Sequence, residues 1–349
     1  TALDDLPVVV ALERPTAGLT WVLSGLPFSI VGVDGTPTGD FEIVRDDPAS
    51  LRLRRQDHRG GSLGPAPDIE VVWTDDPEAA YRLLIDGAVD GAIVDPSSLL
   101  DAERRFGVAS SPGAAVRYYV LNPGSPQLAD RDHRAALLGL VDAEELASQA
   151  DRPDLEAVDG LVSPSIVGYR PDSCGAACGE LDDGTGGIPG GVAWPNEVAL
   201  RVTYAGDGQA GVAEALADQL AAAGVAASAR EATPRDLASA IVDGAPDLFA
   251  FGWLAPAGSV DAVLPPLLRG ESPANVARFA SAGIEELLDA AASTGDDETR
   301  WAILDRAHRL ALSEAKVLPV AASTGTLVVP APTGLTIRAD GSLDLERTD

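Results

Sequence analysis

Runs and periodic repeats of apolar residues divide the first third of the chain into short strands and helices. Apolar runs bounded by turn residues predict four strands, at 7–12, 41–44, 51–55 and 69–73. Helical spacing predicts a short helix at 16–23 and a second helix that begins after Asp76-Pro77 and ends at Gly87. A strand at 92–94 follows, so this stretch completes a β-α-β unit.

The middle of the chain passes from regular elements to a long irregular stretch. The run 116–121 predicts a strand, and 130–149 alternates apolar and charged positions at the period of a helix. Asp130 and Arg134 are spaced to lie on one helical turn, which favours a capping and ion-pair role. Between 151 and 195 the periodicity gives way to Pro, Gly and Asp, which predicts a long excursion over the surface.

A regular alternation of strands and helices begins at residue 198. It predicts strands at 198–204, 225–229 and 248–251, with helices at 211–223 and 234–242 between them. Such alternation favours an α/β unit with largely parallel strand pairing. Two more helices and then two more strands follow, at 284–292, 297–314, 317–322 and 326–329.

Length and composition indicate a globular protein with room for two lobes. The 349 residues exceed the roughly 250 to 300 over which a single hydrophobic core grows. Apolar residues make up 46% of the chain, and 36 Gly and 26 Pro are spread along it, which is typical of a folded protein with many turns.

The charge of the chain argues against two classes of partner. There are 54 acidic and 25 basic residues, a formal net charge of −29, which repels nucleic acid and anionic membrane surfaces. Lys316 is the one lysine beside 24 arginines, a bias typical of a high-GC genome such as that of an actinobacterium. The sequence has no run of about 20 apolar residues and no basic and apolar leader, so an export signal or anchor is expected outside it.

The titratable residues give little support to catalysis. The histidines are His58, His133 and His308, and none has the companions of a catalytic triad or a metal site. His308 falls on an apolar helical stripe with Trp301, which predicts a hydrogen-bonded core histidine. The glycine-rich run 183–191 lacks the Lys-Ser/Thr of a phosphate-binding loop and predicts a plain loop. We therefore expect no enzyme activity, no cofactor and no metal.

Three aromatic residues are candidates for ligand contact. Trp253 follows a buried strand and a glycine, at the carboxyl end of a strand, where α/β proteins place ligand contacts. Aromatic side chains offer a large contact area there with little rotamer freedom to lose, although a core tryptophan fits the pattern equally well. Tyr118 and Tyr119 alternate along their strand, so one is expected to face a ligand and the other a lobe; the sequence leaves open which.

Six short signatures follow one another along the chain. They are Thr38-Gly39-Asp40-Phe41, 84–90 (LIDGAVD), 119–142, Gly252-Trp253, 297–300 and Leu318-Pro319-Val320. In this combination and order the chain resembles the peptide-binding and nickel-binding proteins of bacterial ABC importers, known as extracytoplasmic solute-binding protein family 5. The stretch 119–142 carries the most detail of the resemblance, through Asn122, Asp130, Arg134 and Asp142.

The resemblance implies an α/β fold of the periplasmic-binding-protein type (type II), a two-lobed clamp of mixed sheets flanked by helices. It places one lobe at 1–120 plus 323–349 and the other at 121–322, with strand crossings at 119–122 and 318–322. Family members have a longer N-terminal segment that supplies a first strand. The first lobe is therefore expected to be incomplete and to expose an apolar edge.

The resemblance also implies a function. It predicts the solute-binding component of an ABC-type importer, a monomer that closes on a small peptide-like solute in the cleft between the lobes and delivers it to a membrane permease. The expected ligand contacts are Tyr118, Tyr119, Asn122, Trp253, Leu254 and Pro256. The implied location is extracytoplasmic, as a lipoprotein anchored through a segment outside the given sequence. The alternative is a ligand-sensing module of a larger regulatory or envelope protein, with a degenerate cleft.

One position departs from the family. Its best-known members follow Gly-Trp-x-Ala with an aspartate that pairs with the amino group of a bound peptide, whereas this chain has Pro256 there. The next acid, Asp261, is expected to cap a helix instead. Loss of one partner of a buried charge pair costs about 2 to 5 kcal/mol, so we expect a ligand without an essential ammonium group.

The extracytoplasmic location implied by the resemblance predicts a disulfide between Cys174 and Cys178, the two cysteines of the chain. The loop that it closes is short, so the bond is expected to fix local geometry rather than to carry global stability. Thiol titration of the denatured, non-reduced protein should find no reactive thiol. Two thiols per chain would contradict both the disulfide and its support for an oxidising compartment.

Overall fold

A computed structural model of the chain describes residues 11–25, 41–56, 68–74, 76–94, 96–149, 155–171, 199–206, 209–330, 336–337 and 343–344. The helices in these ranges are α1 (Leu19–Leu23), α2 (Pro77–Ile85), α3 (Pro96–Arg105), α4 (Arg131–Leu138), α5 (Ala143–Gln149), α7 (Ala210–Ala222), α8 (Pro234–Asp243), α9 (Val260–Leu268), α10 (Ala282–Ala292) and α11 (Asp297–Ser313). The strands are β1 (Phe41–Asp46), β2 (Ser50–Arg55), β3 (Asp68–Val72), β4 (Ala92–Ile93), β5 (Gly107–Leu121), β6 (Leu155–Ala157), β7 (Leu200–Tyr204), β8 (Ala227–Glu231), β9 (Leu248–Leu254), β10 (Val317–Val329), β11 (Thr336–Ile337) and β12 (Leu343–Asp344).

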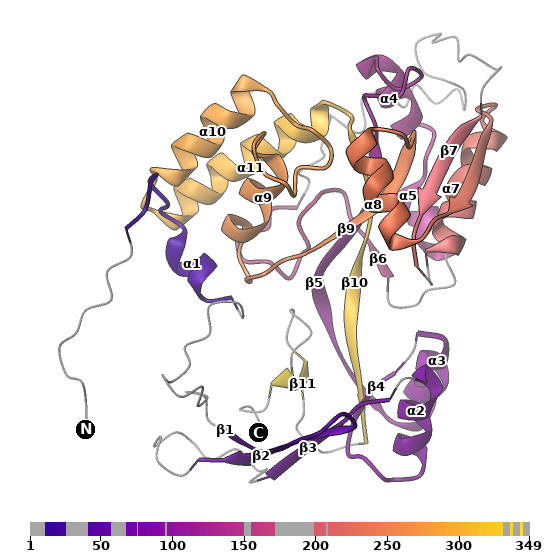
Figure 1. The fold of residues 1–349 in the computed structure, drawn as a ribbon, viewed down its shortest axis with the longest axis vertical. Helices are drawn as coiled ribbons and strands as arrows, with labels where there is room; N and C mark the ends of the chain where they lie inside the picture. Colours follow the sequence, from indigo (N-terminus) through magenta and orange to yellow (C-terminus); the bar gives the residue numbers. More distant parts are fainter. Residues whose placement is uncertain are drawn as a thin grey trace.

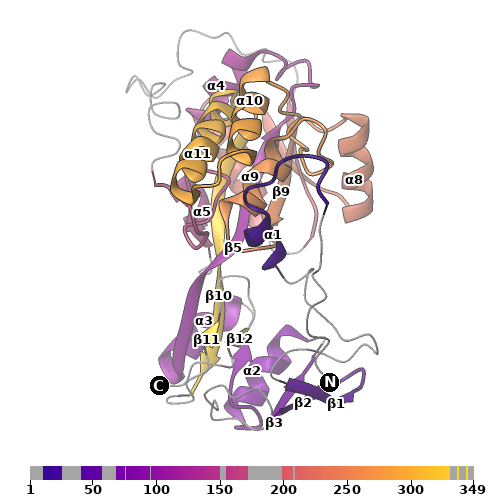
Figure 2. The ribbon, with the colours of Figure 1, turned by 90° about the vertical axis from the view of Figure 1, so that its left-hand side faces the viewer.

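Two bodies joined by a pair of long strands make up the described structure (Figure 1, Figure 2). The upper body in Figure 1 contains α1, α4, α5, α7 to α11, β6 to β9 and the upper ends of β5 and β10. The lower body contains β1 to β4, α2, α3 and the lower ends of the same two strands. Strands β5 and β10 pair antiparallel over most of their length, so one ladder runs through both bodies. The expected mixed α/β architecture is confirmed.

The ladder passes from one body to the other near its middle. In the upper body β5 pairs with β9 as far as Ala115, and in the lower body Leu327 of β10 pairs with Ile93 of β4. Two register shifts occur between residues 319 and 324 of β10, immediately above this crossing. Such irregularities increase the local bend and twist of a strand, so they shape the ladder where it leaves the upper body.

The crossings expected at 119–122 and 318–322 are therefore displaced toward the lower body. Tyr119 and Leu318 both lie inside a core of the upper body. The sequence pattern showed β5 only from residue 116, because Pro112-Gly113 interrupts its apolar run. Proline supplies no N–H to a ladder, so its presence argued against a strand that in fact continues through it.

The sheet of the upper body separates two cores. Its strand order is β10-β5-β9-β7-β8, with β7 parallel to β8 and β9, and β5 antiparallel to both of its neighbours. Successive residues of β5 enter opposite cores because side chains alternate along a strand. Tyr118 and Val120 pack on the side of α9, α10 and α11, whereas Tyr119 and Leu121 pack on the side of α5 and α7.

The alternation of strands and helices predicted from residue 198 is confirmed in its order, although the strands expected at 317–322 and 326–329 form the single strand β10. Helices α7, α8, α10 and α11 begin and end within about two residues of the expected bounds. Helix α9 was expected only as a helix capped by Asp261, without bounds; Pro265 and Pro266 lie within it, and proline removes a helix hydrogen bond. Its start is fixed by Ser259, whose side chain accepts a hydrogen bond from the backbone N–H of Asp261.

Two stretches of the middle region differ from expectation. The helix expected over 130–149 is divided into α4 and α5; Asp130 caps α4 as predicted, and Arg134 donates to the backbone carbonyls of residues 128, 129, 314 and 315. The described part of the expected surface excursion, 155–171, is built into the fold instead. Strand β6 pairs with β10, and Leu161 and Ile166 are buried in the core beside α9 and α11.

The lower body combines a three-stranded sheet with a small helical core. Strands β1, β2 and β3 pair antiparallel in this order, and Asp47 closes the first turn by accepting hydrogen bonds from the N–H of Ala49 (3.0 Å) and Ser50 (2.8 Å). Helices α2 and α3 pack with β4 and Val328 of β10. Among the described residues β4 ends the long sheet, and its Ile93 is 58% exposed. The incomplete first lobe with an exposed apolar edge stays a prediction, because most of the strand expected at 7–12 lies outside the described residues.

His308 on α11 is a core residue of the upper body. Its side chain is buried, and its Nε2 accepts a hydrogen bond from the backbone N–H of Leu161 at 2.9 Å. Burial disfavours the charged imidazolium and lowers the pKa of His308 from 6.5 to about 4. The prediction of a hydrogen-bonded core histidine is confirmed.

The lowered pKa of His308 predicts acid destabilisation. The unfolded chain takes up this proton at higher pH than the folded one, so the contribution is complete above about pH 6.5 and is lost as the pH falls toward 4. The loss amounts to about 3 kcal/mol over this range. His308→Gln keeps an acceptor without the titration and should flatten the profile of unfolding free energy against pH. Parallel profiles for His308→Gln and the wild type would contradict the assignment.

Candidate ligand site at the end of strand β9

The surface at the carboxyl end of β9 carries three residues selected from the sequence, Trp253, Leu254 and Pro256. Strand β9 runs from the core to the surface: Leu248 at its start is buried, whereas Leu254 at its end is 60% exposed. Pro256 is exposed between β9 and α9. Residues 252–258 are called the β9 turn below. They form an accessible, apolar end to an otherwise buried strand.

Trp253 combines features of a core residue and of a surface residue. The side chain is partly buried, packs against the core beside α9 and α11, and lies opposite Val116 of β5 in the ladder. Its indole Nε1 is buried and has no hydrogen-bond partner among the described residues. A buried donor left unpaired costs about 1 to 3 kcal/mol, so an acceptor brought to this nitrogen would stabilise the site.

Tyr118 and Tyr119 are core residues in this conformation. Each is 3% exposed, and they lie in the two different cores of the upper body. The ring of Tyr118 packs 5.7 Å from that of Phe251 on β9, measured between centroids. Burial raises the pKa of both phenols, which keeps them neutral. The expected alternation is confirmed, but neither ring reaches the surface, so a ligand contact for either stays a prediction.

Asn122 follows β5 and holds its end in place. Its amide Nδ2 donates to the carbonyls of Gly244 (3.0 Å) and Pro246 (2.7 Å), and its Oδ1 accepts from the N–H of Gly124 (2.9 Å). Both amide protons are therefore used within the protein. Asn122 fixes the loop before β9 against the end of β5, and a ligand contact for it likewise stays a prediction.

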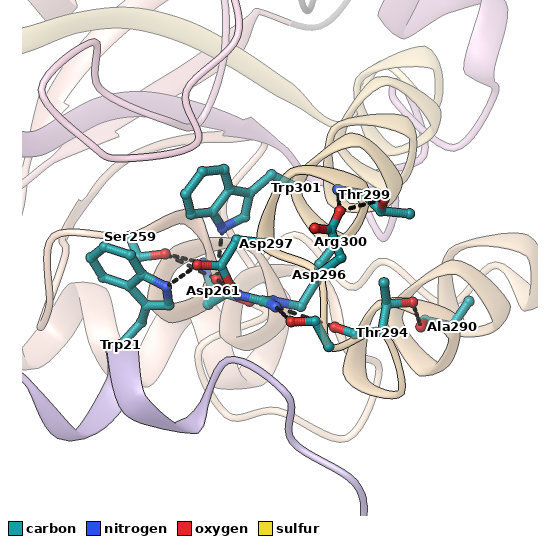
Figure 3. A network of polar contacts seen from close by, with 11 residues as sticks. Trp21, Ser259, Asp261, Ala290, Thr294, Asp296, Asp297, Thr299, Arg300 and Trp301 are labelled. Carbon is teal, nitrogen blue, oxygen red and sulfur yellow. Dashed lines mark hydrogen bonds and ion pairs between the residues drawn. The ribbon is translucent and has the colours of Figure 1, made fainter.

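Asp261, the acid nearest to the β9 turn in the sequence, is fully engaged (Figure 3). One carboxylate oxygen accepts from Arg300 Nε at 2.7 Å; the other accepts from Arg300 Nη2 at 3.2 Å, Trp301 Nε1 at 2.9 Å and Ser259 Oγ at 3.0 Å. Arg300 is 1% exposed, and its hydrogen bond with Asp261 raises the pKa of the guanidinium further. Asp261 lies in the first turn of α9, which Ser259 caps in its place.

A second group of polar contacts lies where the ladder leaves the upper body. The hydroxyls of Ser163 and Ser165 both donate to the carbonyl of Gly113 on β5, at 2.6 and 3.2 Å. These contacts fix the loop after β6 to β5 beside the crossing. The sequence pattern did not reveal the contacts of Ser163 and Ser165, because 151–195 lacks regular periodicity. The apolar residues at 161, 162 and 166 were the available signal that this stretch is buried.

Metal chemistry finds no support in the part of the chain that the structure describes. No group of three or more His, Cys, Asp or Glu side chains is arranged there to hold a metal ion. His58, the run 183–191, Cys174 and Cys178 lie outside the described residues. The disulfide therefore stays a prediction.

Comparison with protein families agrees with a two-bodied binding protein. The model of the bacterial extracellular solute-binding proteins, family 5 (middle region), matches residues 1–275. The chain belongs to this family. Proteins of family 5 are extracellular solute-binding proteins and not enzymes. No curated protein matches it.

Solved structures of low sequence identity share the fold of this family 5 protein. Oligopeptide-binding protein 2 of clavulanic acid biosynthesis has a TM-score of 0.75 at 18% identity, and the match covers 96% of this chain and 69% of that one. The ABC transporter substrate-binding protein CtaP of Listeria monocytogenes has 0.74 at 18%, covering 89% and 66%. DppA of Helicobacter pylori, in complex with the peptide STSA, has 0.72 at 16%, covering 99% and 74%.

The family 5 chain thus spans about two thirds of the length of the Listeria relative and somewhat more of the other two. Their likeness extends over both bodies, since the matches cover nearly all of this chain. None of the described helices combines the length and the apolar character required to cross a membrane.

The buried pair at Asp261 generates a stability prediction. Arg300→Met should lower the free energy of unfolding by about 3 to 5 kcal/mol, because it leaves the Asp261 carboxylate buried without a cation. Arg82→Met removes an exposed arginine that pairs with Asp76 and Glu78, and should cost less than about 1 kcal/mol. Denaturant titration of both variants measures the difference. Equal losses would show that the buried pair does not stabilise the upper body.

Proposed function

We propose that this family 5 protein is the solute-binding component of an ABC-type importer and that it binds a small, peptide-like solute between its two bodies. Family membership supports the class. Among the structural relatives, the Listeria protein is an ABC transporter substrate-binding protein and the Helicobacter protein was solved with a peptide. The β9 turn is the ligand surface in this proposal, with Trp253, Leu254 and Pro256 as its contacts.

The unpaired indole nitrogen of Trp253 is the observation that carries the proposal. It is a buried donor without a described acceptor, at the exposed end of a buried strand. A peptide carbonyl is a suitable acceptor, and the neighbouring apolar surface of Leu254 and Pro256 can cover the rest of a small solute. The proposed site thus combines one directed polar contact with apolar area.

Closure of the two bodies about the ladder crossing completes the proposed mechanism. The lobes in this proposal are 1–120 plus 323–349 and 121–322, with two amendments. Residues 17–25 move with the second lobe, because α1 packs on α9 and α11. The upper end of β5, 114–120, also belongs to the second lobe, because its side chains lie in the two cores of the upper body. Tyr118, Tyr119 and Asn122 support the ligand strand from inside that lobe, and they reach the ligand only if closure rearranges them.

The proposed partner is a permease in the membrane, which receives the solute from the closed protein. The protein acts as a monomer at an extracytoplasmic location, and a segment outside the given sequence anchors it to the membrane. Its net charge of −29 is compatible with this role, because the body that carries the β9 turn does not have to approach nucleic acid or an anionic lipid surface closely.

The proposed ligand carries no essential ammonium group. Pro256 occupies the position where the resemblance places an aspartate, and the next acid along the chain, Asp261, has all its oxygens engaged by Arg300, Trp301 and Ser259. Withdrawing this carboxylate for a ligand would leave Arg300 buried with a weakened partner. An N-blocked or amine-free solute avoids that cost.

Two measurements test the ligand class. Native mass spectrometry of the protein as purified should show a bound small molecule. Calorimetric titration with a pool of di- to pentapeptides, free and N-acetylated, should give no preference for the free amines. Submicromolar binding that disappears on acetylation would contradict the absence of an ammonium site.

The role of Trp253 is tested by Trp253→Phe, which keeps an aromatic ring and removes the N–H. The affinity for the bound solute should fall by roughly 5-fold to 100-fold, since one buried hydrogen bond is lost. Trp73→Phe alters an exposed tryptophan of the lower body and is the matched control. Equal affinities for the two variants would remove Trp253 from the site.

A further inference from the structure

Helix α1 packs closely on the β9 turn from a distant part of the sequence. A Cβ added at Gly25, just after α1, would overlap with the carbonyl oxygen of Pro256, and one added at Gly18, just before α1, would overlap with the carboxylate of Asp261. Gly18 has φ −79°, so glycine is needed at that contact for space rather than for backbone freedom. The two ends of α1 therefore lie against the turn and against the start of α9.

Three contacts hold α1 in this position. The indole Nε1 of Trp21 donates to Asp297 Oδ2 at 3.3 Å, and its ring lies 5.9 Å from that of Trp301, between centroids (Figure 3). The backbone N–H of Ala17 donates to the carbonyl of Ala292 at 2.9 Å. All the partners belong to α10 and α11, so α1 is fixed to the helices that stand beside the turn.

The charges behind α1 connect these contacts to the turn. Asp297 pairs with Arg300 as well as with Trp21, and Arg300 pairs in turn with Asp261 at the start of α9. Figure 3 shows these side chains as one continuous network. The start of α9, just after the β9 turn, is thus fixed by the buried ion pair of Asp261 with Arg300. Gly25 packs against the backbone of the turn at Pro256.

We propose that residues 17–25 are a clasp that sets the position of the β9 turn, and that Gly25 and Trp21 are positioning residues for the ligand site. They act through the turn and the network rather than by touching the ligand. The effect on affinity rests on the proposed function; the effect on the turn itself does not. The clasp therefore makes a prediction for the ligand-free protein.

Gly25→Ala tests the clasp, and Gly295→Ala, at an exposed glycine outside the β9 turn, is its matched control. A Cβ at Gly295 meets nothing within 4 Å. Hydrogen exchange over 252–261 in the ligand-free protein should rise roughly fivefold or more in Gly25→Ala, the ratio that corresponds to about 1 kcal/mol of overpacking. It should stay at the wild-type rate in Gly295→Ala. Wild-type exchange over this segment in both variants would overturn the clasp.

Trp21→Phe gives a second, milder perturbation in case Gly25→Ala unfolds the upper body. It keeps an aromatic ring on the side of Trp301 and removes the N–H donated to Asp297, together with part of the indole's apolar area. The expected rise in exchange is smaller but confined to α1 and 252–261. A rise confined to α1 alone would also overturn the proposal, because α1 would then move without the turn.

The affinity measurement separates the clasp from the proposed function. For any peptide of the pool that the wild type binds, Gly25→Ala should weaken binding by the same factor as it raises exchange, and Gly295→Ala should leave binding unchanged. Raised exchange with unchanged affinity would leave the clasp in place but remove the β9 turn from the ligand site. Unchanged exchange would count against the clasp alone.

Discussion

The antiparallel ladder between β5 and β10 is the constraint on which the rest of the described structure depends. In the upper body the two faces of β5 serve two different cores, so adjacent residues such as Tyr118 and Tyr119 are both buried without touching the same helices. Below the crossing, Val328 of β10 enters the separate core of the lower body. One strand pair therefore contributes to three cores, and a change in its register would move hydrophobic side chains in all of them.

The ion pair of Asp261 with Arg300 is the second constraint, and it acts on orientation more than on net stability. Burying two charges costs nearly as much as their attraction returns, so such a pair is weak evidence for stability. Its geometry is nevertheless demanding, because both partners are satisfied only when α9, α11 and the carbonyl of Thr294 meet in one arrangement. The N-terminal segment packs beside this network, with Gly18 against Asp261 and Trp21 donating to Asp297, although the order of the sequence places that segment with the lower body.

The sequence predicted the elements whose patterns are local. The alternation from residue 198 was visible because each strand and helix carries its own apolar period, and the Gly-Trp signature located the end of β9. The sequence did not reveal elements that depend on distant partners. The lower half of β5 contains Pro112-Gly113 and is held as a strand by β10, and α9 contains two prolines yet is fixed by its cap and by Arg300.

The candidate site shows the same limit. Trp253, Leu254 and Pro256 were recognisable from a local signature and do lie together at an accessible strand end. Tyr118 and Tyr119 were placed on alternate faces correctly, but no sequence pattern could show that helices cover both faces of their strand. The contacts of Gly25 with the β9 turn and of Ser163 with Gly113 join segments far apart in the chain, and only the folded structure brings them together.

The β9 turn lies near the point where the ladder leaves the upper body, and this position bears on the proposed closure of the two bodies. Leu254 lies opposite Ala115 of β5, two residues above Gly113, where Ser163 and Ser165 make the last upper contacts with the strand. At about 3.3 Å per residue, the exposed end of β9 is roughly 7 Å from the crossing. A solute seated there lies close to the axis about which the bodies would rotate. In the proposed mechanism, a rotation that brings the lower body onto the solute gives it contacts with both bodies, and these contacts favour the closed form over the open one.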